Sequence, residues 1–314
     1  MAQSSIRRID VHFGDRVFQL VLRLGSVLVL LLIGGIVLQL VQLALPTIKQ
    51  FGLGFLVSSD WDPVNDQYGA LPFMYGTLVS SAVALVLACP VAVGAALFLN
   101  EVATSRVAKP IAFLIEMLAA IPSVVYGLWG IFVLAPWLRV HLQPWLGEKL
   151  GFLPLFQGPP FGVGMLCAGV VLAIMIIPTI AAISREVFRA VPQAHREAAL
   201  GLGATRWETI WLAVFRTSLP GVIGAVILGL GRALGETMAV TMVIGNRPDI
   251  SASLFAPAQT MASVIANEYP EASGELHIAA LASVGLALFL VSVVINGLAR
   301  WIVWRMARNQ GGAR

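Results

Sequence analysis

The feature that most constrains this chain is a set of long apolar segments. A helix needs about 20 mostly apolar residues to cross the hydrocarbon core of a bilayer. Because lipid offers the backbone no hydrogen-bonding partners, we expect each segment of that length to be helical. Six segments qualify, at approximately residues 21–45, 75–99, 111–136, 161–183, 219–245 and 278–303.

The composition agrees with lipid as the main solvent of the chain. Only 11% of its 314 residues are charged, whereas soluble domains carry about 25%, and the mean hydropathy is +0.88. We therefore predict an all-α integral membrane protein with six transmembrane helices. Residues 21–314 would form a single transmembrane domain, preceded by an N-terminal tail at residues 1–20. The first apolar segment is too long for a signal-peptide core, so we interpret it as a retained span.

Basic residues are shared unequally between the two sides of the membrane. With six spans, both termini lie on one side, and that side carries 15 lysines and arginines against 4 on the other. Cytoplasmic loops are enriched in these residues, so the imbalance predicts cytoplasmic termini and a cytoplasmic tail at residues 1–20. The remaining basic residue, Arg232, lies inside the fifth apolar segment.

The longest cytoplasmic connection, residues 184–218, has a helical pattern of its own. Pro192 would end the helix that continues from the fourth span, and Thr205 and Glu208 are spaced for a capping box that starts a second helix at Arg206–Phe215. The residues themselves leave two interpretations, a lever that docks in a partner's groove or an ordinary interfacial hairpin. The residues that would contact a partner or shape the intervening turn are Glu197, Ala198, Ala199, Gly201, Leu202 and Gly203.

Part of this connection resembles a known motif. Glu197-Ala-Ala, followed after three residues by Gly203, resembles the EAA loop of permease subunits in binding-protein-dependent ABC importers. In that family the loop forms a coupling helix that inserts into the ATPase subunit. The resemblance thus implies an ATPase-coupling role for Glu197, Ala198, Ala199 and Gly203. The family pattern continues with Ile-x-Leu-Pro nine residues later, where this chain has Ala213-Val-Phe-Arg216, and its Leu219-Pro220 comes four residues after the expected Leu-Pro.

Three ionisable residues fall within the apolar segments: Glu116, Arg232 and Glu236. Each charge costs about 2.5–3.5 kcal/mol on insertion scales, so each should face the protein interior or water. In one continuous helix, Arg232 and Glu236 would share a face because they are four residues apart. A guanidinium matches two oxygens of an oxyanion at once, which favours a translocation pathway lined by Arg232. The alternative is a structural ion pair with Glu236, with Glu116 as a candidate second partner.

The strings around these charges resemble the permease subunits of phosphate importers. The resemblance covers most of the chain from about residue 70 and implies a type I ABC importer permease fold. It also implies a translocation role for Arg232 and Glu236. The matching strings are Gly229-Leu-Gly-Arg-Ala-Leu-Gly-Glu-Thr-Met-Ala-Val240, Ile244-Gly-Asn246 and Ala120-Ile-Pro-Ser-Val-Val-Tyr-Gly-Leu-Trp-Gly130.

The same resemblance implies a set of partners and a location. Phosphate importers of this kind combine two homologous permeases with two copies of an ATPase subunit, PstB, in the bacterial inner membrane. A periplasmic phosphate-binding protein, PstS, delivers the substrate. The second permease expected for this chain is PstA.

We therefore expect a permease subunit that moves inorganic phosphate from periplasm to cytoplasm by alternating access. The sequence has no Walker A, GxSxG or HExxH motif and no His/Cys cluster, so we expect no intrinsic ATPase activity, cofactor or metal site. No nucleic-acid partner is expected, because topology explains the basic residues. The alternatives are a permease for another oxyanion such as sulfate or molybdate, and an ATP-independent secondary transporter or channel. A membrane-embedded enzyme is disfavoured by the lack of a nucleophile–base set.

Overall fold

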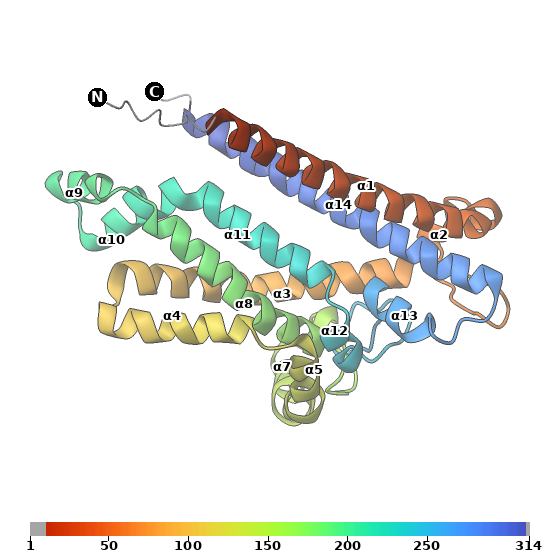
Figure 1. The fold of residues 1–314 in the computed structure, drawn as a ribbon. Helices are drawn as coiled ribbons and strands as arrows, with labels where there is room; N and C mark the ends of the chain where they lie inside the picture. The colour runs from red at the N-terminus through yellow and green to blue at the C-terminus, as the bar shows by residue number, and fades with distance from the viewer. Residues whose placement is uncertain (1–10, 312–314) are drawn as a thin grey trace, which may run out of the picture.

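The computed structural model describes residues 11–311, and this part of the chain is almost entirely helical (Figure 1). Within it, extended pairing is limited to two isolated bridges. Short π-helical or 3-10 segments are labelled η. The elements of the described part are α1 (Val11–Phe51), α2 (Gly54–Val57), α3 (Leu71–Leu97), η1 (Phe98–Val102), α4 (Ser105–Ala119), α5 (Ser123–Trp129), η2 (Gly130–Leu134), α6 (Ala135–Trp137), η3 (Leu138–Leu142), α7 (Gln143–Leu150), η4 (Pro154–Phe156), α8 (Met165–Arg189), α9 (Gln193–Gly201), α10 (Arg206–Thr209), η5 (Ile210–Phe215), α11 (Arg216–Leu234), α12 (Met238–Val243), α13 (Met261–Glu268) and α14 (Glu275–Gly311).

The predicted number of membrane spans is confirmed. Six helical stretches of the described residues are long and apolar enough to cross a bilayer. Of the predicted tail at residues 1–20, residues 11–20 are helical and form the start of α1. Residues 1–10 lie outside the described part. The six stretches are Asp15–Phe51, Leu71–Val102, Ser123–Leu150, Met165–Arg189, Arg206–Leu234 and Glu275–Arg305.

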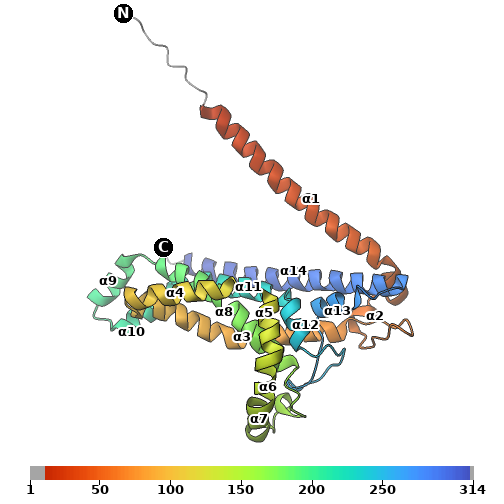
Figure 2. The same cartoon turned by 60° about the horizontal axis from the view of Figure 1, so that its bottom comes forward.

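The third predicted segment, residues 111–136, is two helices rather than one. α4 ends at Ala119, and α5 begins at Ser123 after a turn that contains Pro122. Proline has no backbone N–H and disfavours helical backbone at the residue before it, so the helix stops here. From α5 to α7 the chain is again continuous helix, and this stretch leaves the bundle at a steep angle (Figure 2).

The fifth predicted segment, residues 219–245, is also interrupted. The connection Gly235–Thr237 separates α11 from α12. Glycine is a poor helix former, and the Glu236 carboxylate accepts the N–H of Ala239 at 3.2 Å, which caps α12. The prediction of one continuous helix, which put Arg232 and Glu236 on one face, is therefore wrong.

The centre of the bundle is the packing of α3 against α8. About 67% of the apolar window of α8 is buried, more than in any other span of the described residues, so α8 is the central helix. Small residues let two helices approach closely, and α3 supplies them once per turn on the buried face. These residues are Ala84, Ala88, Ala92 and Ala96.

Helix α1 joins the bundle through part of its length. Ala44 and Thr47 are fully buried beside α14, whereas residues 17–36 are exposed and project away from the other helices (Figure 2). The start of α1 and the end of α14 lie toward the end of the molecule that carries α9 and α10 (Figure 1).

The opposite end of the bundle is closed by a cap. The short helix α13 lies in this cap, and its first turn is buried next to α3 and α14. Its last residue, Glu268, accepts a hydrogen bond from Trp61 Nε1 at 2.9 Å and lies 3.0 Å from Nε2 of His277. These contacts tie α13 to the bundle.

Candidate functional site

The predicted helix–turn–helix forms one tip of the molecule (Figure 1). α9 begins after Pro192, and Gly203 makes the turn with a φ of +86°. Thr205 Oγ1 accepts the N–H of Glu208, whose carboxylate accepts the N–H of Thr205 at 2.8 Å. This capping box starts α10, which continues through η5 directly into α11. The predicted local structure of the segment is therefore confirmed, and the hairpin connects the ends of two spans.

The hairpin presents its predicted contact residues to the outside. Glu197 and Ala198 are exposed, and Ala199 is half-buried. Leu202 is 90% exposed and Leu200 49%, although both are apolar. Exposed leucines beside an exposed carboxylate at a protruding tip are typical of a helix that inserts into a partner's groove.

An ion pair that the sequence did not reveal fixes the start of α9. Arg196 donates from Nη2 and Nε to the two carboxylate oxygens of Glu101, at 2.7 and 3.2 Å. It also donates to the carbonyl oxygens of Val191 at 2.6 Å and Phe188 at 3.0 Å. One side chain therefore joins α9 to the end of α8 and to η1, which follows α3.

Arg232 precedes the helix break, Glu236 lies within it, and the two side chains are not paired. Arg232, in the last turn of α11, donates from Nη1 to Thr179 Oγ1 of α8 at 3.4 Å. Among residues 11–311, no ion pair within 4.0 Å joins it to Glu236. Both side chains are half-buried. The guanidinium is therefore held by one long hydrogen bond and retains donors for another group.

The two helix breaks lie close together in the fold. α5 packs against α12, and a Cβ placed on Gly127 would lie 2.6 Å from Met242 Sδ and 3.1 Å from Ala239 Cα. Tyr126 donates its hydroxyl across the first break to the carbonyl of Leu118 at 2.8 Å. Irregular backbone at membrane depth is tolerated where it is buried in protein or lines a cavity, because its polar groups need hydrogen-bonding partners. The Tyr126 hydroxyl supplies such a partner for the carbonyl of Leu118.

Glu116 has a different partner from the one that the sequence suggested. It pairs with Arg185 of α8 at 2.9 Å rather than with Arg232. Arg185 is six residues beyond Thr179, which is about 9 Å along α8 and roughly 240° around it. Arg232 and Glu116 therefore contact different faces of α8, and the pairing considered for them is wrong.

The chain matches a known family over most of its length. Residues 88–308 match the family described as "Binding-protein-dependent transport system inner membrane component". The match includes both the α9–α10 hairpin and the α11–α12 break. The chain belongs to this family. It is thus a multi-pass membrane protein of a family whose members work with an ATPase and a binding protein.

Relatives within the family are similar across nearly the whole chain. The chain is 45% identical to the phosphate transport system permease protein PstC of Pasteurella multocida (strain Pm70), over 98% of both chains. It is 46% identical to the PstC protein of Haemophilus influenzae (strain ATCC 51907 / DSM 11121 / KW20 / Rd), over 95% of both.

Solved structures support the permease fold of the family. The MetNI methionine ABC transporter in an inward facing conformation matches with a TM-score of 0.57 at 14% identity, over 76% of this chain and 95% of that one. A bacterial ABC transporter involved in the import of the acidic polysaccharide alginate matches with a TM-score of 0.56 at 18% identity, over 92% and 99%. At these identities the likeness shows the fold alone, and it agrees with the predicted ABC importer permease fold.

Proposed function

We propose that this chain is a permease subunit of an ATP-driven importer that moves inorganic phosphate from the periplasm to the cytoplasm. The assignment of phosphate as the substrate rests on the 45% identity, over 98% of both chains, to a protein named as a phosphate transport permease. The half-buried arginine at the α11–α12 break supports an anionic substrate, because a guanidinium matches oxyanion geometry.

The hairpin at the tip is the proposed ATPase-coupling element. Glu197, Ala198 and Ala199 would face the ATPase subunit, and Gly203 would set the angle between α9 and α10. Closure of the ATPase dimer would push α9, and the Arg196–Glu101 pair would pass that movement to α3. Such coupling requires that the transporter has two arrangements of its spans. Nucleotide must bind the ATPase subunits with a different affinity in each arrangement.

Arg232 and Glu236 are the proposed translocation residues. With no ion pair within 4.0 Å between them in the described chain, Arg232 is available to a passing anion. Glu236 already caps α12, so its carboxylate is fixed beside the break and repels an anion that lingers there. A weak site suits transport, because the substrate has to leave again. The role of Glu116 in the pathway stays a prediction, since Arg185 is its partner.

The proposed assembly has this chain beside a second permease, PstA, with two PstB ATPase subunits below and the binding protein PstS above. We place the chain in the bacterial inner membrane with both termini in the cytoplasm. The excess of basic residues on the side of α9 and α10 supports this orientation. The ATPase subunits, not this chain, would hydrolyse ATP.

Uptake of radiolabelled phosphate by the assembled transporter in proteoliposomes tests this function. We expect ATP-dependent uptake that Arg232→Gln reduces at least roughly tenfold, because one charged hydrogen bond is worth about that factor. Arg247→Gln, an exposed arginine paired with Asp249 on an outer connection, is the control and should retain uptake. Uptake of sulfate or molybdate but not phosphate would assign another oxyanion. Uptake without the ATPase would contradict the ABC mechanism.

A further inference from the structure

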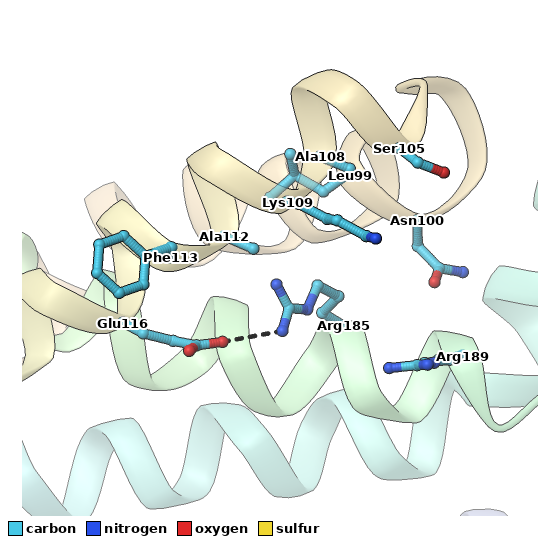
Figure 3. Close-up of a pocket in the computed structure, with 10 residues that line it drawn as sticks. All are labelled: Leu99, Asn100, Ser105, Ala108, Lys109, Ala112, Phe113, Glu116, Arg185 and Arg189. Atoms are coloured by element: carbon cyan, nitrogen blue, oxygen red, sulfur yellow. Dashed lines mark hydrogen bonds and ion pairs between the residues drawn. The ribbon is translucent and has the colours of Figure 1, made fainter.

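A second polar site lies between α4 and α8, on the face of α8 away from Arg232 (Figure 3). The cavity there has a volume of about 400 Å³, and ligand pockets commonly span about 300–1,000 Å³. It reaches Arg189, the last residue of α8, shortly before α9 begins at Gln193. Its polar lining residues are Asn100, Ser105, Lys109, Glu116, Arg185 and Arg189.

The lining of the cavity has more basic than acidic side chains. Lys109 extends from α4 and Arg185 from α8 into the space between the two helices (Figure 3). Of these cations, only Arg185 has a carboxylate partner on the lining, Glu116, at 2.9 Å. Within residues 11–311, the side chains of Lys109 and Arg189 have no hydrogen bond or ion pair. Two positive charges are therefore left without a counterpart.

The other nearby acidic residues do not supply that counterpart. Glu101 is bound by Arg196 and also accepts the amide N–H of Asn100 at 2.6 Å. Glu186 lies 3.7 Å from Arg185, but its side chain is 62% exposed and does not line the cavity. Lys109 and Arg189 are exposed, so the cavity is open to its surroundings. Like charges that line one cavity still repel one another, so a bound anion would stabilise this arrangement.

We propose that this cavity binds a phosphate-type anion, either free inorganic phosphate or the headgroup of an anionic phospholipid. Arg185 uses a single nitrogen for Glu116, which leaves other guanidinium donors for a phosphate oxygen. Ser105 adds a hydroxyl at the first turn of the 15-residue helix α4, where the helix dipole is positive. The exposed ring of Phe113 on the rim offers an apolar surface to an acyl chain.

This site rests on the membrane orientation of the proposed function. It does not depend on the proposed pathway residues Arg232 and Glu236. Arg232 contacts another face of α8, so Arg232→Gln should leave anion binding at this cavity unchanged. Loss of transport in that variant with retained binding, or the reverse, separates the two proposals.

Two measurements on the full-length chain in nanodiscs test the site. The first is binding of radiolabelled inorganic phosphate in discs of neutral phosphatidylcholine. The second is native mass spectrometry of retained phosphatidylglycerol in mixed discs. The double variant Lys109→Gln/Arg189→Gln should weaken one of these bindings by roughly tenfold or more. Lys109→Arg, which keeps the charge, should retain it. Arg106→Gln is the control, because Arg106 is exposed on α4 and does not line the cavity.

Each outcome bears on the proposal. Phosphate binding that the double variant loses assigns the cavity to free phosphate. Selective retention of phosphatidylglycerol that the double variant loses assigns it to a lipid headgroup. If neither ligand binds, or if Arg106→Gln weakens binding as much as the double variant, the cavity is not an anion site and the proposal is overturned.

Discussion

Arg196 and Glu101 lie 95 residues apart in the sequence and form the most enclosed ion pair of the described residues. Their side chains are only 15% and 10% exposed. The pair joins the first turn of α9 to the segment that follows α3, the helix packed on the central helix α8. It is therefore a direct side-chain connection between the proposed ATPase-contacting helix and the core of the bundle.

Glu101→Gln should destabilise the protein and weaken coupling. Removing the charge of one partner leaves Arg196 without its counterion in a mostly enclosed position, at a cost of about 3 kcal/mol. We expect a lower thermal unfolding temperature and more ATP hydrolysed per phosphate imported by the assembled transporter. Glu186→Gln is the control, because that carboxylate is largely exposed and 3.7 Å from its partner. Equal effects of the two variants would contradict the special role of the Arg196–Glu101 pair.

The turn between α9 and α10 should require glycine at position 203. Its φ of +86° lies where a side chain strains the backbone, so Gly203→Ala should cost about 1 kcal/mol and change the angle of α9. Gly201→Ala is the control, because Gly201 is helical, exposed and has open space around it. We expect ATPase coupling to fall only in Gly203→Ala, measured as phosphate-dependent ATP hydrolysis. A fully coupled Gly203→Ala transporter would show that the angle of α9 does not matter.

The close approach of α5 and α12 should be needed for transport. Gly127→Val would place methyl groups against Met242 and against the backbone of Ala239, which cannot move aside as a side chain can. Overpacking of this kind costs about 1–3 kcal/mol, and we expect phosphate uptake to fall with little loss of assembly. Gly94→Val, on α3 with open space around it, is the control. Normal uptake in Gly127→Val would show that the two helix breaks need not stay together.

Local features of this fold followed from the sequence, whereas interactions between distant segments did not. Four of the six spans, the stop at Pro192 and the Thr205 capping box depend on neighbouring residues, and the structure has them where the sequence predicts, whereas the third and fifth predicted segments are interrupted. The break at Pro122 also had a local signal, but the apolar run around it concealed the interruption. The ion pairs of Glu101 and Glu116 join residues 95 and 69 positions apart, and no periodicity encodes such a contact.

Leu202 tests whether the tip of the hairpin binds another protein. An apolar side chain that is 90% exposed contributes almost nothing to the fold of this chain, so Leu202→Asp should leave the thermal unfolding temperature unchanged. A partner's groove would have to desolvate the new carboxylate, which costs several kcal/mol without a counterion. We therefore expect the yield of copurified ATPase subunit to fall by roughly tenfold or more. Leu53→Asp, an 84% exposed leucine toward the opposite end, is the control and should copurify normally. An unchanged ATPase yield in Leu202→Asp would mean that α9 and its turn are not the docking surface.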